Sequence, residues 1–179
     1  MTHELTLRNV RGEQIALSDF QDPPTVLVFF TPTCDACRAM TERFRAWPNA
    51  LPEGVDLQPV FVGQPSDFNS TIEFVPLVEH AWYDDGSVSS AVSANPSPAA
   101  VLIDKEHPTG DQPAYGMQQI EQLVVRPGFW QEPIAQEAAQ QWKAEAGARL
   151  MESGRKADPY GVRTFSTAPK ISFRNRPER

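Results

Sequence analysis

The sequence predicts an α/β fold in which a buried strand leads directly into a helix. Residues 26–30 (Val-Leu-Val-Phe-Phe) form an unbroken apolar run of β-branched and aromatic types, which is typical of a strand buried on both faces. After a short break at 31–33, helix-favouring residues begin at Asp35, and apolar side chains recur at three- and four-residue spacing. A second apolar segment at 55–62 predicts a parallel neighbouring strand, joined to the first by a right-handed crossover.

Length and composition limit the classes of protein to which the chain can belong. The chain has 179 residues, of which 40% are hydrophobic and 22% charged, enough for one globular domain with an appendage. The net charge of −7 argues against nucleic-acid binding by the body of the protein. The first residues lack an apolar signal sequence, and no stretch is long enough for a transmembrane segment. We expect a cytoplasmic protein from the chain as written, or a periplasmic one if the N-terminus is trimmed, so the compartment stays open.

The N-terminal segment predicts a β-hairpin. Apolar side chains alternate at 5–9 and again at 15–17, on either side of the turn residues Arg11-Gly12-Glu13. A turn at 21–24, which contains two prolines, then delivers the chain into the first buried strand.

Shorter elements are predicted between the second parallel strand and the C-terminal part of the domain. Pro65 opens a predicted short helix at 66–74, and an apolar segment at 77–82 predicts a brief strand. After a turn, the small residues of 87–94 predict one or two helical turns.

The last part of the predicted domain begins at a proline. Pro98 directly precedes the apolar segment 99–104, where proline is tolerated because it stands at the start of a strand. A hairpin partner is expected near 112–116, and a helix at 118–124 would cover the sheet.

The only two cysteines, Cys34 and Cys37, stand at the beginning of the first predicted helix. Unpaired backbone N–H groups and the helix dipole favour a thiolate at that position, which makes Cys34 nucleophilic. Two intervening residues place Cys37 one turn further on, so that Cys34 can attack a disulfide and Cys37 can resolve the mixed disulfide. The pattern predicts dithiol–disulfide exchange, with Cys34 and Cys37 as the catalytic pair.

Two other interpretations of the cysteine pair compete with exchange chemistry. A zinc site would need further ligands, but there is no second cysteine pair and the three histidines have no ligand spacing, so we expect no bound metal. An inert disulfide is the other interpretation, although a bridge across two residues closes too short a loop to stabilise a fold substantially.

Three segments resemble the thioredoxin-like superfamily, and within it the TlpA/redoxin group of thiol–disulfide oxidoreductases. They are Gly12–Phe20, Leu27–Cys37 and Ser97–Asp104, which follow one another in the expected order. The resemblance implies a thioredoxin-like fold, in which helices flank a central mixed sheet and a β-hairpin precedes it. It implies a thioredoxin-like domain at residues 1–124.

The resemblance also implies roles for residues away from the cysteines. Pro98 would be the cis-proline that faces the cysteine pair, and the backbone beside it, at Ser97, would pair with a substrate chain. Thr33, directly before Cys34, joins Ser97 and Pro98 as an expected substrate-binding residue. The substrates would be protein thiols and disulfides, and no cofactor is implied.

Several residues depart from the family pattern. Val28 stands where many thioredoxins bury an acid that assists proton transfer, which predicts slower proton shuttling. Thr33 and Ala36 replace a tryptophan and a proline that many members carry. Asp35 adds a negative charge beside Cys34, which opposes thiolate formation and predicts reducing behaviour; alternatively, it is simply a favourable first-turn residue.

Two further segments are predicted beyond residue 124, where the family pattern ends. Residues 125–153 form a helical extension, in which apolar side chains recur at about four-residue spacing from 133 onward. Residues 154–179 form a basic extended tail, with seven Lys or Arg against Asp158 and Glu178. The tail carries +5, so the first 153 residues carry −12 of the total of −7. We expect the tail to dock on the acidic body or on a protein partner.

The sequence thus favours a thiol–disulfide oxidoreductase, more readily a reductase than an oxidase. A peroxiredoxin is a related possibility, since Thr31 precedes Cys34 by three residues, but Leu27 stands where that motif has proline. A copper chaperone of the Sco type would need wider cysteine spacing. The alternative of another class is a redoxin fold kept as a non-catalytic scaffold or accessory subunit, attached to a larger assembly through the C-terminal extension.

Overall fold

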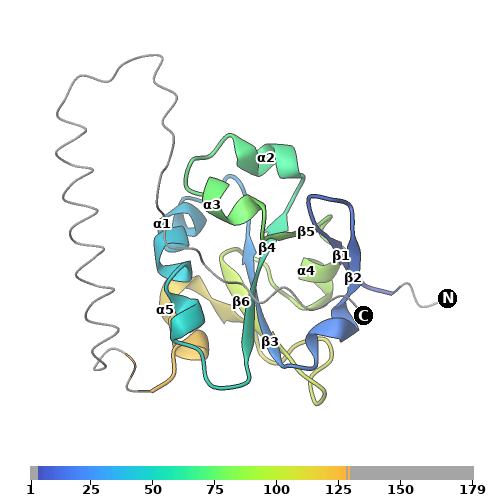
Figure 1. Ribbon diagram of the computed structural model, residues 1–179, viewed down its shortest axis with the longest axis vertical. Coiled ribbons are helices and arrows are strands. Elements are labelled where there is room, and N and C mark those ends of the chain that lie inside the picture. The colour runs from blue at the N-terminus through green and yellow to red at the C-terminus, as the bar shows by residue number, and fades with distance from the viewer. Residues whose placement is uncertain (1–3, 128, 130–179) are drawn as a thin grey trace. The chain divides into compact units, whose positions relative to one another are not determined.

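The computed structural model describes residues 4–127 and 129 of the chain (Figure 1). The helical extension predicted at 125–153 and the basic tail predicted at 154–179 fall almost entirely outside these residues. The division of the chain into three parts therefore stays a prediction, and the fold described below is that of the N-terminal part.

A seven-stranded mixed sheet forms the centre of the described part, in the strand order β2-β1-β5-β4-β3-β6-β7. The three strands β3, β4 and β5 run parallel to one another, and every other pairing is antiparallel. The strands are β1 (Thr6–Arg8), β2 (Gln14–Ala16), β3 (Thr25–Phe30), β4 (Asp56–Val62), β5 (Trp82–Asp84), β6 (Ala99–Ile103) and β7 (Ala114–Tyr115).

β3 occupies the middle of the sheet because all six of its residues are apolar or β-branched and all six are buried. It pairs in parallel with β4, with Phe30 opposite Phe61, and antiparallel with β6, with Val28 opposite Ala100. The predicted pair of parallel strands is confirmed. The chain leaves the carboxyl end of β3 and enters α1 after only four residues.

Helices cover both faces of the sheet (Figure 1). They are the 3₁₀ helices η1 (Leu17–Phe20) and η2 (Trp47–Asn49), and the α-helices α1 (Asp35–Phe44), α2 (Pro65–Asn69), α3 (Val75–Val78), α4 (Ser87–Ala91) and α5 (Gly116–Val124). Within the part of the chain that the structure describes, no helix combines the length and the apolar character that a bilayer crossing requires.

α1 and α5 cover one face of the sheet. The ring of Phe30 on β3 meets the ring of Phe44 on α1 edge to face, with 5.5 Å between centroids. The two helices are joined by an ion pair in which Arg43 Nη1 lies 2.6 Å from Glu121 Oε1. These contacts hold the C-terminal end of α1 against β3 and α5, and the two cysteines lie at the opposite end of the helix.

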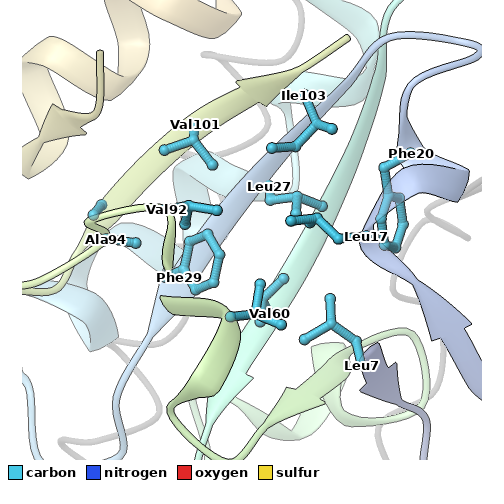
Figure 2. Close-up of a cluster of buried hydrophobic side chains, with 12 residues drawn as sticks. Leu7, Leu17, Phe20, Leu27, Phe29, Val60, Val92, Ala94, Val101 and Ile103 are labelled. Carbon is cyan, nitrogen blue, oxygen red and sulfur yellow. The ribbon is translucent and has the colours of Figure 1, made fainter. Parts of the chain in front are cut away.

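α4 and η1 cover the opposite face. Leu27 and Phe29 point away from α1, because successive residues of a strand face opposite sides of the sheet. They enter a buried cluster with Val92, just after α4, and Phe20 of η1 (Figure 2). Val88 of α4 belongs to the same cluster. The central strand is thus anchored from both sides.

Most predicted elements are confirmed. β1 and β2 form the expected hairpin, with Thr6 opposite Ala16 and a turn that contains Gly12 at φ +82°. The strand expected after Pro98 is β6, its hairpin partner is β7, and the helix that covers them is α5.

The segment between β4 and β5 differs from the prediction. A single helix at 66–74 and a strand at 77–82 are both wrong, because the chain forms two short helices there and β5 begins only after them. Phe68 on α2 stacks on Phe61 of β4 with 4.1 Å between ring centroids, and Leu77 on α3 is fully buried. Burial of these side chains against the sheet outweighs the local preference of an apolar segment for an extended strand.

Candidate active site

Cys34 is the residue at which the chain changes from extended to helical. Its backbone is extended (φ −90°, ψ 110°), and it caps the N-terminus of α1. Its sulfur accepts a hydrogen bond from the backbone N–H of Cys37 at 3.0 Å, and its own N–H donates to the carbonyl of Thr31 at 3.3 Å. The sulfur therefore occupies the position that a capping oxygen takes in most helices, where negative charge is favoured.

Cys34 and Cys37 form a disulfide, and their Cα atoms are 5.1 Å apart, within the range such bonds require. The two cysteines differ in exposure. Cys34 is half-buried, whereas Cys37 has no solvent-accessible surface. An incoming disulfide can therefore reach the sulfur of Cys34 more readily than that of Cys37.

The second side of the site comes from the segment that precedes β6. The carbonyl oxygen of Ser97 lies 3.6 Å from the sulfur of Cys34. The Ser97–Pro98 peptide bond is cis, as the resemblance implied, and Pro98 is buried. The carbonyl of Pro98 accepts a hydrogen bond from the N–H of Gly116 at 2.9 Å, which ties this segment to the start of α5.

The side chain of Ser97 has an unusual environment. Its hydroxyl oxygen is buried but has no hydrogen-bond partner in the part of the chain that the structure describes. Buried hydroxyl groups normally find a partner, because leaving one unpaired is unfavourable.

The charge beside Cys34 is partly compensated. The carboxylate of Asp35 forms an ion pair with the guanidinium of Arg38, one turn further along α1. The side chain of Asp35 is 88% exposed, so water screens much of its effect on the neighbouring sulfur. Arg38 was not among the predicted site residues, although its three-residue spacing from an acid was the available signal.

No buried acid stands behind the cysteines in the described residues. Val28 is fully buried at the position where many thioredoxins carry one. Among residues 4–127 and 129, the buried charged side chain is that of Asp84, and its two oxygens accept from Val88 N at 3.0 Å and Ser89 N at 2.8 Å. Asp84 therefore caps α4. The described residues also contain no cluster of three or more side chains suited to holding a metal.

The structure brings four of the five predicted site residues together: Cys34, Cys37, Ser97 and Pro98. Thr33 is exposed on the connection between β3 and α1, next to Cys34 in the chain. Chemically, the site offers an accessible sulfur at a helix N-terminus, a second sulfur bonded to it, and a carbonyl at the rim of the pair.

No protein-family model matches the chain, and no curated protein matches it. Solved structures do match. A secreted disulfide oxidoreductase of Mycobacterium tuberculosis, homologous to E. coli DsbE, is 22% identical with a TM-score of 0.50, covering 66% of this chain and 91% of that one. The exposed lipoprotein thioredoxin Etrx1 of Streptococcus pneumoniae is 18% identical with a TM-score of 0.54, covering 68% and 97%. StoA of Bacillus subtilis is 19% identical with a TM-score of 0.52, covering 69% and 96%.

At these identities the similarity establishes the fold. The fold of the described part is thioredoxin-like, it carries a CxxC motif at the start of α1, and it is the fold of solved thiol–disulfide oxidoreductases. The shared region covers about two thirds of this chain.

Proposed function

We propose that this protein is a thiol–disulfide oxidoreductase that exchanges its Cys34–Cys37 couple with disulfides of protein substrates and works as a reductase. The observation that carries the proposal is the place of the Cys34 sulfur. It is accessible, it receives the N–H of Cys37 at 3.0 Å, and it lies in a helix cap. That combination activates a thiol for attack on a disulfide.

The proposed exchange proceeds in two steps. In the reduced protein, the thiolate of Cys34 attacks one sulfur of a substrate disulfide, so that a Cys34–substrate bond forms and the other substrate sulfur leaves as a thiolate. The thiolate of Cys37 then attacks the Cys34 sulfur. The Cys34–Cys37 disulfide forms, the second substrate sulfur leaves, and two electrons have passed to the substrate.

The surroundings of Cys34 support the reducing direction. A thiol can donate to the carbonyl of Ser97 at 3.6 Å, whereas a thiolate is repelled by that oxygen. Asp35 adds negative charge nearby, although its ion pair with Arg38 offsets part of it. The cap of α1 stabilises the Cys34 thiolate, whereas the Ser97 carbonyl and Asp35 limit that stabilisation. A reduced form whose thiolate is only moderately stabilised gives up its electrons more readily than one whose thiolate is strongly stabilised.

Ser97 and Pro98 are proposed to bind the substrate chain, with Thr33 at the rim. An extended peptide beside Cys34 would pair with the backbone at Ser97, because main-chain pairing gives affinity without sequence selectivity.

Reduction of insulin by dithiothreitol tests the activity. The wild-type protein should accelerate precipitation of the insulin B chain, and Cys34→Ser should abolish the acceleration. Activity no greater than that of Cys34→Ser would contradict an exchange function.

Equilibration with glutathione buffers tests the direction. We expect a midpoint potential closer to the roughly −270 mV of a reducing dithiol than to the roughly −120 mV of an oxidising one. A midpoint near the oxidising value would overturn the reductase assignment while leaving the exchange function intact.

A further inference from the structure

The segment Ser93–Pro98, which carries Ser97 to the sulfur of Cys34, has few regular hydrogen bonds of its own. It lies between α4 and β6. At its start, Ser93 N donates to Ser90 O at 3.2 Å and Ala94 N donates to Ser89 O at 2.7 Å. At its end, Pro98 O accepts from Gly116 N at 2.9 Å. A further contact is needed to fix the backbone between these two ends, if Ser97 is to lie at a constant distance from Cys34.

Ser93 adopts a backbone conformation that needs support. Its φ is +58°, in the left-handed region that residues other than glycine rarely occupy and that carries an energetic cost. The hydroxyl of Tyr115 donates a hydrogen bond to the carbonyl oxygen of Ser93 at 2.5 Å. This bond crosses from β7 to the segment, 22 residues apart in sequence, and holds the carbonyl in the direction that the left-handed conformation gives it.

The backbone of Tyr115 is itself fixed. Its N–H donates to Gln119 Oε1 at 2.9 Å, it lies opposite Ala99 in the β6–β7 pairing, and the next residue, Gly116, bonds Pro98. These contacts fix the backbone from which the Tyr115 side chain reaches Ser93. Between Ser93 and Ser97 the ring of Pro96 fixes one of the intervening φ angles, which reduces the freedom of the chain to absorb a shift.

We propose that Tyr115 is a positioning residue for disulfide exchange: through its hydrogen bond to Ser93 it holds the segment Ser93–Pro98 and so sets the carbonyl of Ser97 beside Cys34. The proposal rests on the exchange function proposed above. Tyr115 does not touch the reacting sulfurs. It acts on the part of the site where a substrate chain would pair, so its effect belongs to substrate binding and not to the reactivity of Cys34.

The test compares Tyr115→Phe with Tyr83→Phe in the full-length protein. Both substitutions remove a tyrosine hydroxyl that donates to a backbone carbonyl, but Tyr83 bonds Val78 at 3.3 Å, outside the segment. We expect Tyr115→Phe to raise KM for insulin by about twofold to tenfold, the range that one hydrogen bond contributes. We expect kcat and the rate at which iodoacetamide alkylates Cys34 to change less than about twofold. Tyr83→Phe should leave KM unchanged.

Hydrogen exchange supplies a readout that does not depend on activity. The amide of Ala94, at the start of the segment, should exchange faster in Tyr115→Phe than in wild type and at the wild-type rate in Tyr83→Phe. An unchanged KM together with unchanged exchange at Ala94 would overturn the positioning role, as would an equal rise of KM in Tyr83→Phe. A wild-type protein without activity on insulin would overturn the proposed function instead, and exchange at Ala94 would then decide alone whether Tyr115 holds the segment.

Discussion

At the scale of single residues, the two cysteines are chemically alike but differ in what surrounds them. Cys34 is half-buried and lies in the cap of α1, whereas Cys37 is fully buried beneath it. Exposure and the helix N-terminus therefore act on the same sulfur. The different roles that we propose for the two cysteines thus follow from their positions and not from their residue type.

This asymmetry predicts selective alkylation. When the reduced protein is treated with a limiting amount of iodoacetamide, Cys34 should be labelled before Cys37, because its sulfur is both more accessible and more nucleophilic. Peptide mapping by mass spectrometry gives the order of labelling. Preferential labelling of Cys37 would show that the attacking and resolving roles have been assigned the wrong way round.

Tyr83 predicts a pH dependence of stability. Burial raises the pKa of Tyr83 to about 12, and the negative charge of Glu79 adds to the effect. The ionised side chain is thus disfavoured in the folded protein. The contribution of Tyr83 to the free energy of unfolding is therefore complete below pH 10, and it is lost as the pH rises from about 10 to about 12.

Urea unfolding of wild type and Tyr83→Phe at several pH values measures this contribution. The difference between the two free energies of unfolding should change by up to about 2–3 kcal/mol across that window, with wild type losing the more. Other groups that titrate there contribute equally to both proteins. A constant difference between pH 9 and pH 12 would show that Tyr83 ionises as freely in the folded chain as in the unfolded one.

At the scale of elements, α4 depends on one buried carboxylate. Asp84, at the end of β5, accepts hydrogen bonds from the N–H groups of Val88 and Ser89 in the first turn of the helix. Asp84→Ala would leave both groups unpaired in a buried place, which should lower the free energy of unfolding by roughly 2–4 kcal/mol.

Asp85→Ala is the matched control for that substitution. Asp85 is exposed and accepts from Ser87 N at 3.0 Å, so its loss should cost less than about 1 kcal/mol. Urea denaturation compares the two variants. If both variants lost the same free energy of unfolding, burial of the Asp84 carboxylate would contribute nothing to the stability of the protein.

Elements with a strong local signal could be predicted from the sequence. The continuous apolar run of β3, the strand that follows Pro98, and the hairpin around Gly12 are fixed by patterns a few residues long, and the structure contains all three. The region from α2 to β5 could not be predicted in this way. There, Phe68 and Leu77 pack against residues distant in sequence, and that packing decides the local conformation.

The same distinction between local patterns and long-range contacts applies to the residues of the candidate site. The pairing of Cys34 with Cys37 is local, so their spacing was sufficient to predict it. Ser97 and Pro98 were placed there by the resemblance to a known family. The contact of Tyr115 with Ser93 depends on the register of β7 against β6, which no short pattern encodes.

At the scale of the whole molecule, the sheet carries the site at one end of its central strand. β3 is covered on one face by α1 and on the other by the cluster that contains Phe29 and Val92 (Figure 2). Its antiparallel neighbour β6 begins at the segment that faces Cys34. The two halves of the site are thus attached to adjacent strands of a packed core, which fixes the distance between them.

Trapping of a mixed disulfide tests the central claim most directly, because it isolates the step in which Cys34 attacks a protein disulfide. Reduced Cys37→Ser protein is incubated with native insulin, and the products are separated without reductant. We predict an adduct joined through Cys34 that dithiothreitol releases and that is nearly absent with Cys34→Ser, whose remaining thiol is buried. Failure of Cys37→Ser to form the adduct, or equal trapping by Cys34→Ser, would contradict the account.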